Sequence, residues 1–208
     1  MVLLFDMYGV IIKESKGKFT PYVFSRFPET DKIFFRQLYI KASTGQIDGL
    51  EFFSVLGFDD SAAAITDYIE NHLTLDVGFV PFAEKYKNRY DFALLSNDVL
   101  EWSERIRTYH NIGGYFKEAI ISANAFCRKP GRRIYEIALE RLGAPARECI
   151  FIDNSAENLT VAGEIGMNTV LFNRDGESYD GDTVDDFSGL DELIENKYGG
   201  RNDLYASS

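Results

Sequence analysis

Several polar side chains stand directly after short apolar runs, at positions where a buried strand would end. Asp6 follows VLLF, Ser96 and Asn97 follow FALL, and Asp153 and Asn154 follow CIFI. A carboxylate at the end of a buried strand costs free energy unless it is paired, so such a position often has a chemical role. These positions are therefore the first candidates for a reactive site.

The candidate residues have the types that a nucleophilic displacement requires. Asp6 is a candidate nucleophile toward an electrophilic phosphorus or carbon atom. Ser96 offers a hydroxyl and Asn97 a backbone N–H to one oxygen of the attacked group. Lys129 offers a point charge that can pair with Asp6 and with an anionic substrate. Each has an ordinary structural explanation alone, but together, in this order at strand ends, they indicate a functional site.

A further pair of residues suits a hard cation. Asp153 can hold Mg²⁺, which prefers oxygen ligands and keeps several waters. Asn158 falls in the first turn of the helix expected after Asp153. From there its amide can orient a metal-bound water. We therefore expect Mg²⁺ as the cofactor.

The apolar runs also indicate the elements that position these residues. VLLF, FALL, AII, CIFI and TVLF each have the length of a buried strand and do not alternate with polar residues. Such runs are typical of a parallel sheet covered on both faces. Helical patterns cover 131–143, where Gly143 is a stop signal, and 155–167, where Ser155 is a candidate N-cap. The order predicts a doubly wound α/β sheet with its crevice at the carboxyl ends of the strands.

Residues 14–80 interrupt this alternation. Their patterns are helical and dense in aromatic residues such as Phe35 and Tyr39, and no strand-ending acid occurs among them. We predict a helical cap over 14–80, inserted into a core formed by 1–13 and 81–208. The aromatic residues are expected to pack this cap, and Arg36 is expected to be a solvated charge.

The composition argues against some classes of partner. The 208 residues carry a formal net charge of −11 and show no basic stripe, which argues against nucleic-acid binding. The two cysteines, Cys127 and Cys149, have no metal-type spacing and are expected to be reduced thiols. No signal peptide or membrane-spanning stretch is recognisable. We therefore expect a cytoplasmic protein without membrane association.

The motifs resemble those of the haloacid dehalogenase superfamily of hydrolases. The matching stretches are FDMYGV (5–10), LLSND (94–98), RKPGRRIYEIALERLG (128–143) and FIDNSAENLTVAGEIGM (151–167). The resemblance implies a Rossmann-like sheet, a mobile turn and hairpin around residues 7–13, and a helical cap inserted there. It also implies a phosphatase that forms an aspartyl-phosphate, here on Asp6. The most similar members are small sugar-phosphate phosphatases, so a small phosphorylated metabolite is the expected partner.

Two positions depart from the pattern of most phosphatases in this superfamily. Tyr8 stands where they carry an Asp that acts as general acid and base. A phenol titrates near pH 10 and is a poor base, although the Tyr8 backbone carbonyl can still bind a metal. Asn154 stands where many relatives have the main metal-binding Asp. The metal set expected from the resemblance, Asp6, Tyr8, Asp153 and Asn154, should therefore hold Mg²⁺ less tightly than three carboxylates would.

Tyr8 leaves two alternatives to a phosphatase open. The 2-haloacid dehalogenases of the superfamily carry Asp-x-Tyr-Gly at this place and displace halide without a metal. However, Val10 stands where those enzymes have a threonine, and Asp153 suits a metal better than a halocarboxylate. The other alternative is a binding protein with an eroded site, since both Tyr8 and Asn154 depart from the catalytic pattern. Of the three, we favour the phosphatase.

Overall fold

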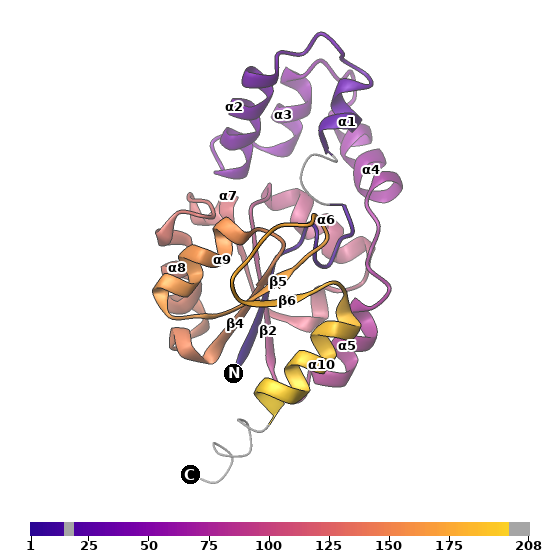
Figure 1. Ribbon diagram of the computed structural model, residues 1–208. Coiled ribbons are helices and arrows are strands. Elements are labelled where there is room, and N and C mark those ends of the chain that lie inside the picture. The colour runs from indigo at the N-terminus through magenta and orange to yellow at the C-terminus, as the bar shows by residue number, and fades with distance from the viewer. Residues whose placement is uncertain (15–18, 200–208) are drawn as a thin grey trace.

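A parallel six-stranded sheet forms the centre of the computed structural model, which describes residues 1–14 and 19–199 (Figure 1). The strand order is β3-β2-β1-β4-β5-β6, and every neighbouring pair is parallel. The strands are β1 (Val2–Phe5), β2 (Asp91–Ser96), β3 (Phe116–Ile121), β4 (Cys149–Asp153), β5 (Asn168–Phe172) and β6 (Asp182–Val184). The predicted doubly wound sheet is confirmed, and β6 is an edge strand that the apolar runs did not indicate.

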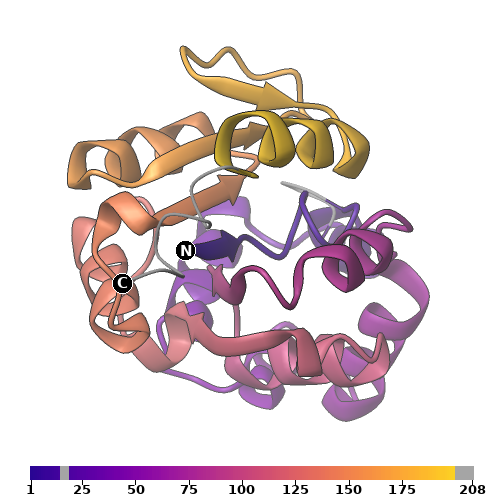
Figure 2. The same ribbon diagram turned by 90° about the horizontal axis from the view of Figure 1, so that it is seen from below.

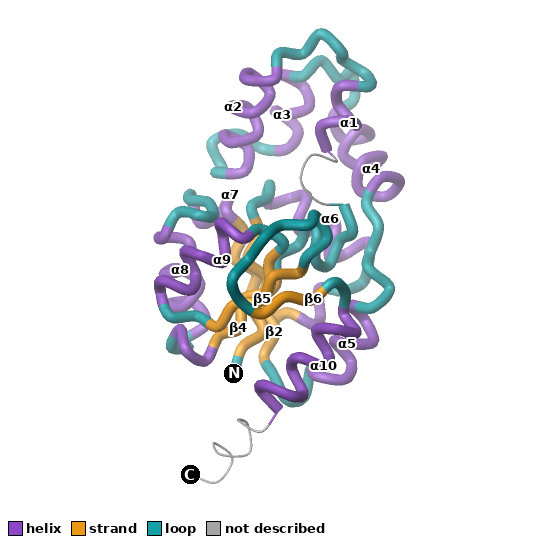
Figure 3. Tube along the Cα trace, viewed as in Figure 1, coloured by secondary structure: helices purple, strands orange, loops and turns teal. Residues whose placement is uncertain are grey.

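Helices cover both faces of the sheet (Figure 3). They are α5 (Phe79–Tyr86), α6 (Leu100–Tyr109), α7 (Ser122–Ala125), α8 (Arg132–Leu142), α9 (Ala156–Ile165) and α10 (Phe187–Leu193), which a further helical turn extends over Ile194–Tyr198. Side chains alternate along β1, so Leu3 and Phe5 pack in the cluster that contains α5 and α10, whereas Val2 and Leu4 pack in the cluster that contains α8 and α9. No helix in the described ranges is long and apolar enough to cross a membrane.

The two helices predicted near the reactive stretches form close to their expected bounds. Gly143 ends α8 with a φ of 60°, and Gly166 ends α9 with a φ of 99°. Both angles lie in the left-handed region that glycine adopts without a steric penalty. Ser155 stands at the N-cap of α9, as predicted, but its side chain makes no capping bond. The Glu177 carboxylate instead accepts the Ala156 N–H at 2.7 Å.

Four helices from the 14–80 block lie together beyond the carboxyl ends of the strands, at the top of Figure 1. They are α1 (Phe19–Phe24), α2 (Lys32–Ser43), α3 (Gly49–Val55) and α4 (Ser61–His72). Helices α2, α3 and α4 begin after Asp31, Asp48 and Asp60, whose carboxylates each accept a backbone N–H of the first turn. The division into a core domain and a cap domain stays a prediction, although the helical character of the block is as expected.

The turn after β1 connects the sheet to these helices. Gly9 has a φ of 79°, and its N–H donates to the Ile12 carbonyl at 2.7 Å. Arg174, just after β5, donates to the carbonyls of Gly9 and Val10 and forms an ion pair with Asp76. These bonds hold the turn against the chain that returns from α4. The mobility that the family resemblance implies for 7–13 stays a prediction.

Candidate active site

Asp6 lies in the middle of the molecule, because β1 is a central strand of the sheet. Seen from below, the N-terminus and β1 are surrounded by the other elements (Figure 2). The Asp6 N–H donates to the Ile152 carbonyl at 2.9 Å and so continues the pairing with β4. Asp6 therefore stands at the carboxyl edge of the sheet, where the sequence predicts the crevice.

Lys129 joins three of the strand ends through its ammonium group. Its Nζ lies 2.9 Å from Asp6 Oδ1 and 2.7 Å from Asp153 Oδ2, and it also donates to the Leu95 carbonyl at 2.9 Å. Lys129 is only 4% exposed. Burial alone would lower its pKa, but the two carboxylates outweigh burial and raise it. Lys129 is therefore a fixed positive charge, and all three of its protons are engaged.

One oxygen of Asp6 is immobilised, and the other is available. Oδ1 accepts the Met7 N–H at 2.8 Å and pairs with Lys129. The described residues donate no hydrogen bond to Oδ2. Burial raises the pKa of Asp6 to about 6, with Asp153 adding to the rise and Lys129 opposing it. Above that pH the carboxylate is ionised, which a nucleophile requires.

Asn97 holds the backbone of Lys129. Its side-chain oxygen accepts the Lys129 N–H at 2.9 Å, and its amide nitrogen donates to the Lys129 carbonyl at 2.9 Å. Ser96 is fully buried, and its hydroxyl has no hydrogen-bond partner among the described residues. The predicted roles of Ser96 and Asn97 in binding the substrate oxygens stay predictions, and the observed role of the Asn97 side chain is to position Lys129.

Both oxygens of Asp153 are occupied by protein donors. Oδ1 accepts from the Ser155 N–H at 2.8 Å and from the Asn158 amide at 3.1 Å. Oδ2 accepts from the Asn158 amide at 3.0 Å and pairs with Lys129. Asp153 is fully buried. Direct binding of a metal would have to displace these donors, so the geometry favours a positioning role for Asp153, and its predicted metal role stays a prediction.

Asn154 differs from Asp153 because its side-chain oxygen accepts no hydrogen bond from the described residues. Its amide nitrogen donates to Asp175 Oδ2 at 2.8 Å. Asn154 lines the same cavity as Asp6 and Tyr8. The described residues contain no group of three or more Asp, Glu, His or Cys side chains suited to a metal. A cation between Asp6 and Asn154 would meet the Asp6 carboxylate and neutral oxygens from Asn154 and Tyr8.

Asp98 is a site residue that the sequence patterns did not indicate. The Tyr8 hydroxyl donates to Asp98 Oδ1 at 3.1 Å, and the Val99 N–H donates to the same oxygen at 2.8 Å. Oδ2 of Asp98 is buried without a hydrogen-bond partner among the described residues. Burial raises the pKa of Asp98 to about 8, while these two donors oppose the rise. The available signal was its place in LLSND, directly after Ser96 and Asn97.

We expect Asp98→Asn to stabilise the protein increasingly as the pH rises. The pKa of Asp98 is higher in the folded state than in the unfolded chain, so the folded state binds more protons between about pH 4 and pH 8. The contribution of Asp98 to the free energy of unfolding therefore falls as the pH rises through this range. Urea unfolding at pH 5 and pH 9 measures the effect. A variant whose gain over the wild type is equal at both pH values would contradict the assignment.

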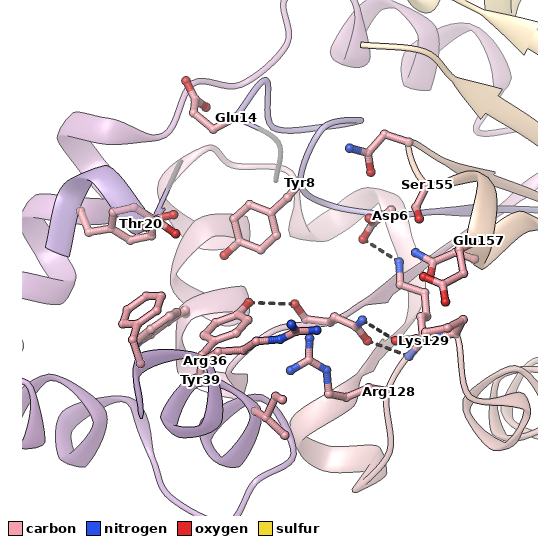
Figure 4. A pocket seen from close by; sticks show the side chains of 18 residues that line it. Asp6, Tyr8, Glu14, Thr20, Arg36, Tyr39, Arg128, Lys129, Ser155 and Glu157 are labelled. Carbon is pink, nitrogen blue, oxygen red and sulfur yellow. Dashed lines mark hydrogen bonds and ion pairs between the residues drawn. The ribbon is translucent and has the colours of Figure 1, made fainter. Parts of the chain in front are cut away.

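A cavity of about 740 Å³ opens over Asp6 (Figure 4). Segments at the carboxyl edge of the sheet contribute Asp6 and Lys129 to its lining, whereas α2 and α4 contribute Arg36, Tyr39 and Tyr68. The Tyr39 hydroxyl donates to the Asn97 carbonyl at 3.2 Å. From the sequence, Tyr39 was expected to pack the cap and Arg36 to be a solvated charge, because helical spacing does not say which face of α2 turns toward the sheet.

Comparison with known proteins decides the family. The family model for haloacid dehalogenase-like hydrolases matches residues 1–166, which is most of the chain. The protein is a haloacid dehalogenase-like hydrolase. The resemblance predicted from the motifs is therefore confirmed, and so is the assignment to a hydrolase family.

The proteins similar to this chain include both a dehalogenase and a phosphatase. The chain is 33% identical over 94 residues to (S)-2-haloacid dehalogenase 4A of Burkholderia cepacia, a match that spans 45% of this chain and 41% of that protein. A phosphatase of the family from Thermococcus onnurineus superposes with a TM-score of 0.72 at 19% identity, covering 93% of this chain and 97% of that one. A family enzyme of Bacteroides thetaiotaomicron, in complex with magnesium and inorganic phosphate, gives a TM-score of 0.68 at 21% identity, with 86% and 96% covered. The structural matches establish a shared fold.

Proposed function

We propose that the protein hydrolyses a small phosphomonoester through an aspartyl-phosphate on Asp6. The observation that carries this proposal is the contact between Asp6 and the buried ammonium of Lys129, 2.9 Å apart. The ammonium fixes one carboxylate oxygen and supplies positive charge beside the place where a phosphoryl group would be attacked. The likeness of the fold to an enzyme that binds magnesium and inorganic phosphate supports the same reaction.

The reaction has two steps in this proposal. Asp6 Oδ2 attacks phosphorus, the bond from phosphorus to the ester oxygen breaks, and the alcohol leaves with one proton. Water then attacks phosphorus in the aspartyl-phosphate, releasing inorganic phosphate and regenerating the carboxylate. Tyr8 is a weak proton donor for the first step, since burial and the Asp98 charge raise its pKa well above the usual value. Esters with good leaving groups, such as aryl phosphates, are therefore the favoured test substrates.

The residues around Asp6 fit a weakly held Mg²⁺ ion. Mg²⁺ often binds through one or two carboxylates together with substrate phosphate and water. Asp6, the Tyr8 carbonyl and the Asn154 side-chain oxygen would hold it here. The ion would neutralise charge on the phosphoryl oxygens.

We expect Asn154→Asp to strengthen Mg²⁺ binding and to lower the stability of the protein when no metal is bound. The new carboxylate would face Asp175 across the present 2.8 Å contact, and like charges this close repel each other unless a cation lies near. The melting temperature should fall without Mg²⁺, and the half-saturating Mg²⁺ concentration should fall about tenfold, which corresponds to about 1.4 kcal/mol. Thermal melts across a magnesium titration measure both effects.

Asn71→Asp is the matched control for this variant. Asn71 also donates to an aspartate, Asp67 at 3.0 Å, but it lies on the exposed face of α4. Its replacement creates a similar carboxylate pair outside the cavity. Magnesium titrations that shift the melting temperatures of both variants equally would argue against a cation site at Asn154.

A dehalogenase is the second candidate, and three observations favour it. Halide leaves without a proton, so the reaction needs no acid at the position of Tyr8. Asp153 is fully engaged by Lys129, Ser155 and Asn158, and a metal-free enzyme does not need it as a ligand. The partial match to a haloacid dehalogenase points the same way.

One assay panel separates these candidates. It combines aryl phosphates with and without Mg²⁺ and 2-chloropropanoate with a chelator, and it measures phosphate and halide release. Phosphate release that depends on Mg²⁺ supports the phosphatase, and halide release in the presence of the chelator replaces it with the dehalogenase. The absence of turnover with every substrate and metal would indicate the eroded binding protein.

A further inference from the structure

Two arginines, one from the helical block and one from the core, meet at the cavity. Arg36 lies on α2, and Arg128 directly precedes Lys129 in the core. Both line the cavity that contains Asp6. Figure 4 shows their side chains reaching toward each other from opposite sides. The pKa of Arg128 is lowered by burial and also by the charge of Arg36, which is consistent with this proximity.

No carboxylate neutralises this arginine pair. Among residues 1–14 and 19–199, neither Arg36 nor Arg128 forms an ion pair, whereas most of the other described arginines do. Arg128 donates to the Ser43 hydroxyl at 2.6 Å and lies 5.4 Å from the centre of the Tyr39 ring. Two neighbouring guanidinium groups without an anionic partner repel each other, and an anion between them removes that repulsion. In a chain of net charge −11, such a pair stands out as a site for an anion.

The arginine pair is separate from the charge that serves Asp6. Lys129 turns toward the strand ends, where it contacts Asp6, Asp153 and the Leu95 carbonyl. Arg128, its neighbour in sequence, reaches instead to Ser43 on α2. The cavity therefore has one cation beside the nucleophile and two more on the side of α2. Glu14 and Glu157 also line the cavity, and Figure 4 shows both away from the two arginines.

We infer that Arg36 and Arg128 bind a second anionic group of the substrate, a carboxylate or a phosphate, while its reacting phosphoryl group lies at Asp6. The inference rests on the proposed phosphatase function and narrows its substrates to small phosphomonoesters that carry another anion. Guanidinium groups suit this role because their planar N–H forks match carboxylate and phosphate oxygens. A cavity of about 740 Å³ accommodates a molecule of metabolite size.

Two aryl phosphates of nearly equal shape test the inference. 4-Carboxyphenyl phosphate carries a second anion, whereas 4-nitrophenyl phosphate has a neutral group of the same planar shape. Of the two esters, 4-nitrophenyl phosphate releases the better leaving group, 4-nitrophenol. We expect kcat/KM to be at least about tenfold higher for the carboxylate, a difference that leaving-group chemistry would reverse. 1,4-Phenylene bisphosphate, compared in the same assay, shows whether a carboxylate or a phosphate is preferred as the second group.

Arginine variants connect the preference to the site. Arg36→Gln and Arg128→Gln should each bring the ratio of the two kcat/KM values toward one. Arg132→Gln removes an arginine from the exposed start of α8 and should keep the wild-type ratio. Arg36 is exposed, so its replacement should leave the fold intact. Turnover with a ratio near one in the wild type, or a ratio that both variants preserve, would overturn the inference while leaving the phosphatase proposal in place.

A binding measurement tests the anion site separately from the proposed phosphatase activity. 4-Carboxyphenylphosphonate and 4-nitrophenylphosphonate have a carbon–phosphorus bond that Asp6 does not cleave, and calorimetry can compare their affinities. Tighter binding of the carboxylate, reduced in Arg36→Gln, supports the anion site even if no phosphomonoester is hydrolysed. Equal affinities for the two phosphonates would overturn the anion site whatever the turnover.

Discussion

Asp6→Asn is expected to reduce phosphomonoesterase turnover at least about a thousandfold. The amide is a poor nucleophile, so removal of the carboxylate should cost about as much as nucleophile removal does in other enzymes that form covalent intermediates. The measurement is phosphate release from 4-nitrophenyl phosphate with Mg²⁺ under saturating conditions. Asp185→Asn is the matched control, since it makes the same change at an exposed residue outside the cavity.

The stability of Asp6→Asn separates loss of chemistry from loss of fold. The substitution removes one of the two carboxylates that pair with Lys129, but Asp153 still pairs with it at 2.7 Å. The variant should therefore remain folded in urea titrations and bind a non-hydrolysed phosphonate. Turnover of a folded Asp6→Asn within a few-fold of the wild type would remove Asp6 as the nucleophile.

Lys129→Met is expected to have the largest effect on stability, about 3–5 kcal/mol, as well as a large loss of turnover. The ammonium is buried between Asp6 and Asp153, and its removal leaves two buried carboxylates facing each other without a counter-charge. Urea unfolding measures the stability change at pH 7. Lys129→Arg should not restore activity, because the longer planar group does not fit three acceptors arranged around a single ammonium.

A double variant tests whether the cost comes from unpaired charge. Lys129→Met combined with Asp153→Asn removes one of the stranded carboxylates and should recover part of the stability lost in the single variant. It should not recover turnover, since the charge beside Asp6 is still absent. The stability loss of the double variant is compared with the sum of the losses in Lys129→Met and Asp153→Asn. A loss equal to that sum would show that Lys129 and Asp153 do not interact as the structure indicates.

The strand ends were predictable from the sequence because parallel strands bring their carboxyl ends to one edge. Asp6, Lys129 and Asp153 were expected to lie together, and the structure places the Lys129 ammonium 2.9 Å from Asp6 and 2.7 Å from Asp153. The roles within this group were harder to predict. A buried carboxylate such as Asp153 suits a metal or a set of N–H donors equally well, so residue type alone does not decide between these roles.

The contacts that the sequence did not indicate depend on the directions of side chains from distant parts of the chain. Tyr8 and Asp98 are 90 positions apart in sequence and share a hydrogen bond of 3.1 Å, which no local spacing indicates. Arg36 and Tyr39 face the cavity because of how α2 lies over the strand ends, whereas an aromatic and charged helix pattern fits packing and solvation just as well. The sequence therefore indicated the chemistry near Asp6 better than the part of the cavity that selects the substrate.

The covalent intermediate is the central claim, and one measurement tests it directly. The enzyme is mixed with 4-nitrophenyl phosphate and Mg²⁺, quenched in acid within the first turnovers, digested and mapped by mass spectrometry. We predict a phosphoryl group on the peptide that contains Asp6, lost on incubation at neutral pH and absent from Asp6→Asn. Burst release of 4-nitrophenol with no phosphoryl group on that peptide, or with the group on another residue, would contradict the account.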